Sequence, residues 1–302
     1  MTQPAYAYRP KQVDAIVVRP FDFDFPDDLE PRWIPGHLVR AQFFNGVSLT
    51  MPYLEPFLVK TMREASEHVD SAELREDIRG FNGQEASHYK CHRRLNALLK
   101  ANGFPELQAV EDRIAAAYER LAKRDLRTRL AYSAGFECMT NGFTTWLINK
   151  RHKLFAGAES SVTSFWLMHM VEETEHKTVA FDVYMAVCGA YWPRAKGVFH
   201  GSFHVIGLGL VGMAAALRRD GPLLRPRRMA ELAREACALT WNVLPFLLRA
   251  LLPWHDPRGE ADPAWMQAWT AGHATFLAER PAGSRLPLVD TSDPVMPVPF
   301  GP

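Results

Sequence analysis

Two copies of the motif Glu-x-x-His are the residues of this chain best suited to chemistry. The first copy is Glu85 with His88, and the second is Glu173 with His176. On an α-helix, residues three apart lie on one face about a turn from each other, so a carboxylate and an imidazole can bind one metal ion. One copy is weak evidence, because long helices rich in Glu and His produce it by chance. Two copies favour a dinuclear site, which needs two such helices and one further acid from each of two partner helices.

Two further acids stand at suitable positions. Glu55 lies among apolar neighbours upstream of the first motif, and Glu137 is the one acid in the otherwise neutral span 130–148, upstream of the second. A buried lone carboxylate is costly unless something pairs with it, and two divalent cations are an efficient partner. The residue before a proline is biased away from helix, and Pro56 follows Glu55. Glu64 is therefore the alternative acid on this segment.

Polar residues beside the motifs extend the candidate site. His169 precedes Glu173 by four residues on the same helix face; it is either a third imidazole ligand, a hydrogen-bonding neighbour or plain core. Ligating imidazoles usually donate their second N–H to a carboxylate or amide. We expect four residues to surround the ligands, with the first two reaching across to the opposite helix: Gln84, Glu172, His92 and Asp182. The predicted ligands are Glu55, Glu85, His88, Glu137, His169, Glu173 and His176.

The elements that must position these residues are predicted to be helices. From residue 37 to about 252 the chain is rich in Ala, Leu, Arg and Glu, its apolar residues recur at spacings of three and four, and β-branched alternation is almost absent. This pattern predicts an all-α protein. The expected helices are 37–50, 53–69, 71–101, 106–123, 126–154, 160–188, 193–218 and 227–252.

The two ends of the chain differ from this helical domain, 37–252. Six prolines and no helical or strand period in residues 1–36 predict an extended arm lying over the main body. The C-terminal segment, 253–302, ends in 22 residues with six prolines, which predict a loosely held tail. Within the helical domain, 193–252 is expected to form additional apolar helices.

Composition narrows the function classes. The 302 residues are 47% hydrophobic and carry 35 Lys and Arg against 34 Asp and Glu, so the net charge of +1 argues against a nucleic-acid partner. Four scattered cysteines without a Cys-x-x-Cys pair argue against a zinc ribbon or a disulfide framework. The N-terminus shows no basic stretch followed by an apolar one, so we expect no secretory signal and a cytoplasmic location.

The uncharged span 197–217 is long enough to cross a bilayer and has basic flanks. Three interpretations stay open: a buried or cavity-lining helix, peripheral membrane attachment, and a true span. Membrane attachment would favour a lipid-like substrate. His200 and His204 lie one turn apart in this span, but we expect them to be non-ligands because no acid is near them in the sequence.

The order Glu, Glu-x-x-His, Glu, Glu-x-x-His over about 52–188 resembles the ferritin-like diiron carboxylate superfamily. The sequences at 21–28, 84–88 and 172–182 resemble, more narrowly, the bacterial family labelled "predicted metal-dependent hydrolase". The pattern His-x-x-x-Glu-x-x-His is similar to a helix of the arylamine N-oxygenases, in which an extra histidine joins the usual six ligands. The resemblance implies a ferritin-like four-helix bundle, with extra C-terminal helices here, and a pair of iron ions.

Four carboxylates and two or three imidazoles, without a thiolate, suit iron or manganese better than copper(I) or structural zinc. We expect a non-haem diiron oxygenase or oxidase that activates O2 to oxidise a small or lipid-like substrate. Such an enzyme takes its electrons from a separate electron donor. A dinuclear metal-dependent hydrolase is the alternative. Iron oxidation and storage is the least favoured, because the chain continues far beyond Cys188. A homodimer is a further expectation. Residues that could line a cavity, or simply form core, are Phe136, Phe143, Trp146, Phe165, Trp166, Met168 and Met170.

Overall fold

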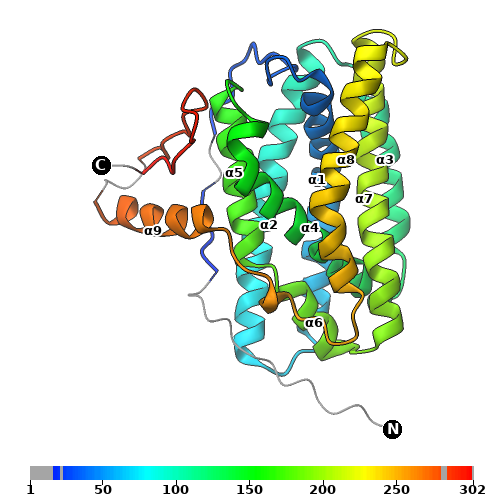
Figure 1. Ribbon diagram of the computed structural model, residues 1–302. Helices are drawn as coiled ribbons and strands as arrows, with labels where there is room; N and C mark the ends of the chain where they lie inside the picture. Colours follow the sequence, from blue (N-terminus) through cyan, green and yellow to red (C-terminus); the bar gives the residue numbers. More distant parts are fainter. Residues whose placement is uncertain (1–15, 21–22, 280–283, 301–302) are drawn as a thin grey trace.

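The computed structural model describes residues 16–20, 23–279 and 284–300, and within these ranges it contains helices and no strand (Figure 1). The predicted all-α class is confirmed. The elements are α1 (Leu38–Ser66), α2 (Ala72–Ala101), α3 (Leu107–Ala122), α4 (Leu126–Leu154), α5 (Ser160–Glu175), α6 (Val179–Val187), α7 (Tyr191–Arg219), α8 (Pro226–Ala250), the 3₁₀ turn η1 (Pro257–Gly259) and α9 (Ala264–Glu279).

Side chains cap the N-termini of several of these helices. The side chain of Ser71 accepts a hydrogen bond from the Leu74 N–H at the start of α2. Asp125 and Glu159 cap α4 and α5 in the same way. Such caps satisfy backbone donors that the first turn leaves without an intrahelical partner, so these boundaries are set by nearby residues.

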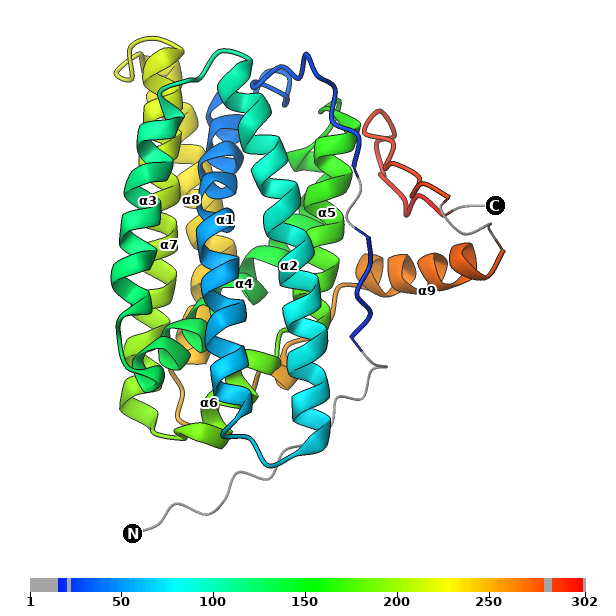
Figure 2. The same ribbon diagram turned by 180° about the vertical axis from the view of Figure 1, so that it is seen from behind.

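Helix α1 is continuous where the sequence predicts a break between 50 and 53. It runs through Pro52 and Pro56, although a proline inside a helix removes one backbone hydrogen bond and crowds the preceding turn. The prediction of two helices is wrong because α1 lies between α2 and α7 and buries most of its length against them (Figure 2). Tertiary packing outweighs the local cost of the prolines. Glu55 therefore sits within a helix and is buried.

The predicted helix 160–188 is two helices. Helix α5 ends at Glu175, three residues form a turn, and α6 begins at Val179. His176 is the first residue after α5, and its backbone N–H still donates to the Glu172 carbonyl at 3.1 Å. The second Glu-x-x-His motif thus keeps its helical spacing while the chain turns immediately after its histidine.

Helix α7 packs closely along α1 and α4. A Cβ atom at Gly197 would collide with the Ala131 carbonyl, and one at Gly209 would touch Val47 on α1. Small residues at these positions let the helix backbones approach each other. Among the described residues, α7 is the one helix long and apolar enough to cross a membrane by length and composition. In the fold it is a bundle helix with one side buried.

The ends of the chain pack against α5. Phe23 and Phe25 of the arm make edge contacts with Phe165. Residues 1–15 and 21–22 of the predicted arm lie outside the described residues. Helix α9 lies beside α5 outside the bundle (Figure 1). The described part of the C-terminal tail is not loosely held as predicted, because Val289 and Met296 are buried. Burial of these two apolar side chains holds the tail in place despite its many prolines.

Candidate metal centre

The bundle brings the seven predicted ligands together in its interior, and all seven are buried. Glu55 comes from α1, Glu137 from α4, and the two motifs from α2 and α5. Their ligand atoms form overlapping groups, within each of which all atoms lie within 4.8 Å of one another and could hold a metal ion. The two principal groups are Glu85, Glu137, Glu173 and His176, and His88, His169 and Glu173. A third group joins Glu55, Glu85 and His88, and a fourth joins Glu55, His92 and His169.

Glu173 links the two principal groups. Its Oε2 lies 3.2 Å from Nε2 of His176, whereas its Oε1 lies 2.9 Å from Nε2 of His169 and 3.6 Å from Nδ1 of His88. Burial alone would raise the pKa of this carboxyl, but the two neighbouring histidines, His176 and His169, hold it well below its usual range. An anionic carboxylate with one oxygen toward each group could bridge two cations.

Glu85 faces the same histidine as Glu173. Its Oε1 lies 3.4 Å from Nε2 of His176, and Glu137 Oε2 lies 4.0 Å from that nitrogen. Glu55 stands at the other end, with Oε1 at 3.8 Å from Nε2 of His169. The donors therefore surround a volume between four helix segments, with carboxylates on both sides of the histidines.

Buried carboxylate oxygens test whether metal ions fit here. Both oxygens of Glu55 and both oxygens of Glu85 are buried without a hydrogen-bond partner among the described residues. Burial, together with repulsion from neighbouring acids, raises the pKa of both carboxyls well above the usual value. Burial likewise lowers the pKa of His88. Buried carboxylates without partners, such as Glu55 and Glu85, are rare in folded proteins, and cations beside them would supply the missing partners. The residues present fit a metal pair.

The residue that precedes each motif orients the histidine of the other motif. Glu172 Oε2 on α5 lies 2.9 Å from Nε2 of His88, and Gln84 Oε1 on α2 lies 2.8 Å from Nδ1 of His176. Each imidazole can donate its N–H to this acceptor. The other ring nitrogen, Nδ1 of His88 and Nε2 of His176, then faces the carboxylates with its lone pair. This arrangement sets the ring orientations that metal ligation requires.

The imidazole rings of His92 and His169 contact each other. Nε2 of His92 lies 3.1 Å from Nδ1 of His169, and Nδ1 of His92 lies 2.8 Å from the Ser48 hydroxyl. Nε2 of His169 remains directed at Glu173. His169 thus has one nitrogen at the centre, whereas His92 supports it from behind and lies 3.9 Å from the nearest Glu55 oxygen.

Arg19 of the N-terminal arm also belongs to the residues around the predicted ligands, and sequence reasoning missed it. Its guanidinium lies 3.1 Å from Glu172 and 2.6 Å from Glu175, and Gln84 also donates to Glu175 at 2.9 Å. Glu175 is not a surface residue, because the arm and α9 cover that face of α5. Arg19 stands in a segment without any period, so no sequence signal points to it.

Two other candidates have different partners. Both oxygens of Asp182 accept hydrogen bonds from Arg258, at 2.6 and 2.9 Å, instead of orienting a motif histidine as expected. Asp182 lies in α6, beyond the turn that follows His176, which carries it toward η1. Glu64, the alternative to Glu55, is half-exposed and ion-paired with Arg129 at 2.7 Å.

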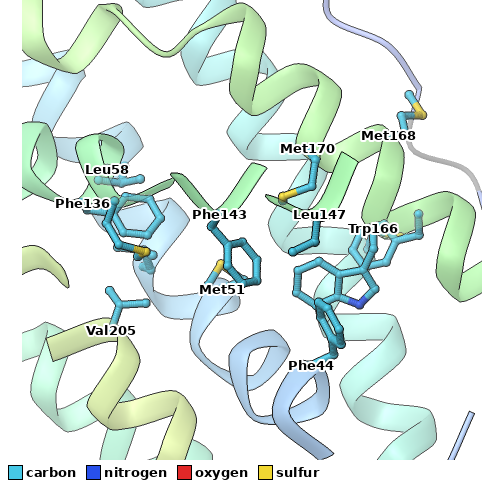
Figure 3. Close-up of a cluster of buried hydrophobic side chains, with 14 of the residues drawn as sticks. Phe44, Met51, Leu58, Phe136, Phe143, Leu147, Trp166, Met168, Met170 and Val205 are labelled. Atoms are coloured by element: carbon cyan, nitrogen blue, oxygen red, sulfur yellow. The ribbon is translucent and has the colours of Figure 1, made fainter. Parts of the chain in front are cut away.

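A small apolar cavity of about 50 Å³ adjoins His169 and Glu173. Figure 3 shows part of its wall, where Met51, Phe143 and Met170 lie in one buried cluster. Four of the residues expected either to line a cavity or to form core do line it, namely Phe136, Phe143, Trp166 and Met170. Phe165 and Met168 are core, and Trp146 lines a larger cavity beyond.

Comparison with known proteins agrees with a metal centre. A family model described as "Predicted metal-dependent hydrolase" matches residues 17–261, a range that includes Arg19, all seven predicted ligands and Arg258. Neither the curated proteins nor the solved structures contain a match to this chain.

Proposed function

The chain belongs to the family of predicted metal-dependent hydrolases, and on this premise we propose that it is a diiron oxidoreductase that uses O2 to oxidise an apolar organic substrate. The observation that carries the proposal is the apolar character of the cavity beside Glu173 and His169. Apart from these two residues, the polar groups on its lining side chains are the Thr140 hydroxyl and the Trp166 indole N–H among the described residues. An apolar cavity favours binding of apolar groups, and both O2 and a hydrocarbon group are apolar.

The four carboxylates and three imidazoles have distinct roles in this proposal. Glu55 and Glu137 would each hold one metal ion, and Glu85 and Glu173 would supply carboxylates to both. His88, His176 and His169 supply neutral nitrogen donors. Four carboxylates balance the charge of two divalent cations, so the filled site can be buried without a net charge. When bound, two iron ions would supply the electrons that reduce O2 and would then be reduced again by an external donor.

The residues around the ligands keep this site in shape and keep it dry. Glu172 and Gln84 hold the two motif histidines at 2.9 and 2.8 Å. Arg19 forms ion pairs with both Glu172 and Glu175 on the side that faces the arm. Apolar side chains on α1, α4 and α5 exclude water from the other side. Rigid ligands in a dry cavity favour reaction at the bound substrate over loss of the oxidant to solvent.

The proposed reaction balances with an external two-electron donor. One oxygen atom of O2 enters a C–H or N–H bond of the substrate, and the other leaves as water. Two electrons and two protons from the donor complete the reduction, so a reduced redox protein or reduced flavin is required as co-reactant.

The second candidate is metal-assisted hydrolysis, which the family description favours. Two metal ions would then activate a water molecule and polarise a carbonyl or phosphoryl oxygen. The cavity supports this function less, because its wall is mostly apolar and, besides His169 and Glu173, offers a polar substrate group only Thr140 and the indole N–H of Trp166 among the described residues.

Anaerobic loading with Fe(II), followed by mixing with oxygenated buffer, tests the proposal. We expect two iron ions per chain, O2 uptake in proportion to bound iron, and a transient change in visible absorption. Zinc-loaded protein should show neither O2 uptake nor the colour change. Hydrolysis of simple esters or phosphodiesters that proceeds without oxygen and survives zinc substitution would overturn the oxidoreductase proposal in favour of the hydrolase.

A further inference from the structure

A second apolar cavity lies outside the one at the metal centre. It has a volume of about 410 Å³, within the range typical of small-molecule sites, and it is bounded by α1, α4, α7 and α8. Phe43, Ile206 and Leu239 line both this outer cavity and the inner one. The two cavities are therefore adjacent, and these three side chains lie at the boundary between them.

The outer cavity opens to the surface between α7 and α8. Both helices pack mainly on other helices of the bundle rather than on each other, and side chains of both line the cavity. Three of its lining side chains are strongly exposed for apolar residues: Phe203 at 61%, Leu244 at 43% and Leu210 at 41%. Exposed apolar residues at the rim of an apolar cavity mark a binding entrance.

Charged groups at this cavity are already paired. Arg40 forms an ion pair with Glu235 at 2.8 Å and also donates to the backbone carbonyls of Lys153 and Leu154. The remaining described lining is apolar except for Thr240. A ligand therefore gains by burying hydrocarbon in this space, and its polar end is better placed in water at the entrance.

We propose that the side chains at this boundary admit one long unbranched hydrocarbon chain, which enters the outer cavity between α7 and α8 and ends in the inner one beside His169 and Glu173. This assignment rests on the proposed function, because it names the substrate that the metal centre oxidises near the chain end. The inner cavity of about 50 Å³ is too small for a ring system or a branched skeleton, whereas the end of a linear chain fits it. The outer cavity holds the rest of the chain.

Fluorescence of cis-parinaric acid, a linear polyunsaturated chain, tests the binding directly on zinc-loaded protein. Trp146 lines the outer cavity and Trp166 the inner one, so a bound chain should accept their excitation energy. We expect saturable binding of one chain per protein. Ile206→Trp, which fills the shared wall, should weaken binding at least tenfold. Leu208→Trp is the matched control on the same helix, at a partly buried residue that lines neither cavity, and should bind like the wild type.

The outcomes separate this proposal from the proposed function. Metal binding and O2 uptake without chain binding, or equal weakening by both tryptophan variants, would overturn the chain site alone. Chain binding by protein that takes up no metal would overturn the substrate assignment together with the oxidoreductase.

Two further experiments identify the source of the hydrocarbon chain. Sedimentation with phosphatidylcholine vesicles that decreases in Trp241→Ser, a residue 83% exposed on α8, would assign the chain to a bilayer lipid. Binding of free palmitic acid in competition with the probe, without vesicle sedimentation, would assign it to a free fatty acid. Either result supports the site, and failure of both ligands to bind overturns it.

Discussion

Glu172 Oε2 lies 2.9 Å from Nε2 of His88, so an acid on α5 fixes the ring of a histidine on α2. Removing such a partner typically weakens metal binding by about 10–100-fold. Glu172→Ala should show this loss, and Glu172→Gln, which keeps an acceptor, should lose less. Competition titration with a coloured chelator measures both. Wild-type affinity in the alanine variant would show that the ring orientation does not depend on Glu172.

Glu55→Gln should act in opposite directions on the metal-free and metal-loaded protein. The substitution removes a buried acid that has no hydrogen-bond partner among the described residues, so the metal-free protein should gain stability toward urea. The same variant should bind one metal ion instead of two. Metal analysis and urea unfolding measure these effects.

Glu64→Gln is the matched control on α1, because Glu64 is half-exposed and paired with Arg129. It should keep two metal ions and change the unfolding free energy by less than about 1 kcal/mol. Loss of metal from Glu64→Gln but not from Glu55→Gln would reverse the ligand assignment on α1.

Gly197→Ala should destabilise the fold, since a Cβ there would collide with the backbone carbonyl of Ala131 on α4. Overpacking of this kind costs about 1–3 kcal/mol. Gly207→Ala on the same helix has nothing within 4 Å of the new Cβ. It should stabilise by about 0.5–1 kcal/mol, because alanine loses less backbone entropy than glycine in a helix. Thermal unfolding of both variants checks the sign, and equal effects would contradict the close approach of α7 to α4.

His273 should make the wild type less stable in acid. Burial lowers its pKa to about 4, and Arg19 donates a hydrogen bond to its Nδ1. Because the unfolded chain takes up this proton near pH 6.5 and the folded protein does not, stability is present above pH 6.5 and is lost as the pH falls toward 4.

His273→Gln and His273→Phe both remove that titration. Between pH 7 and pH 5 the wild type should lose about 1–2 kcal/mol more unfolding free energy than either variant. At pH 7, His273→Phe should be the less stable of the two, because phenylalanine has no acceptor for Arg19. Parallel pH profiles for all three proteins would exclude His273 as the source of acid sensitivity.

Individual residues show why part of the fold was predictable. Glu85 and His88 share a helix, so their spacing alone puts them on one face. The caps at Ser71 and Asp125 are also local, and both helices begin where expected. The break predicted near residue 50 failed because burial of α1 outweighs Pro52 and Pro56. The turn after His176 had no local signal in the apolar run that follows it.

Residue types and helical spacing by themselves determined the all-α class, the family resemblance and which acids and histidines were candidates for a common centre. Tertiary structure decided what surrounds them: Arg19 on Glu172, Arg258 on Asp182, and the two cavities that share Phe43, Ile206 and Leu239. Helical periodicity is a short-range property written into consecutive residues. Contacts between an arm, a bundle and a distant turn depend on how all the helices pack at once, and no local pattern encodes them.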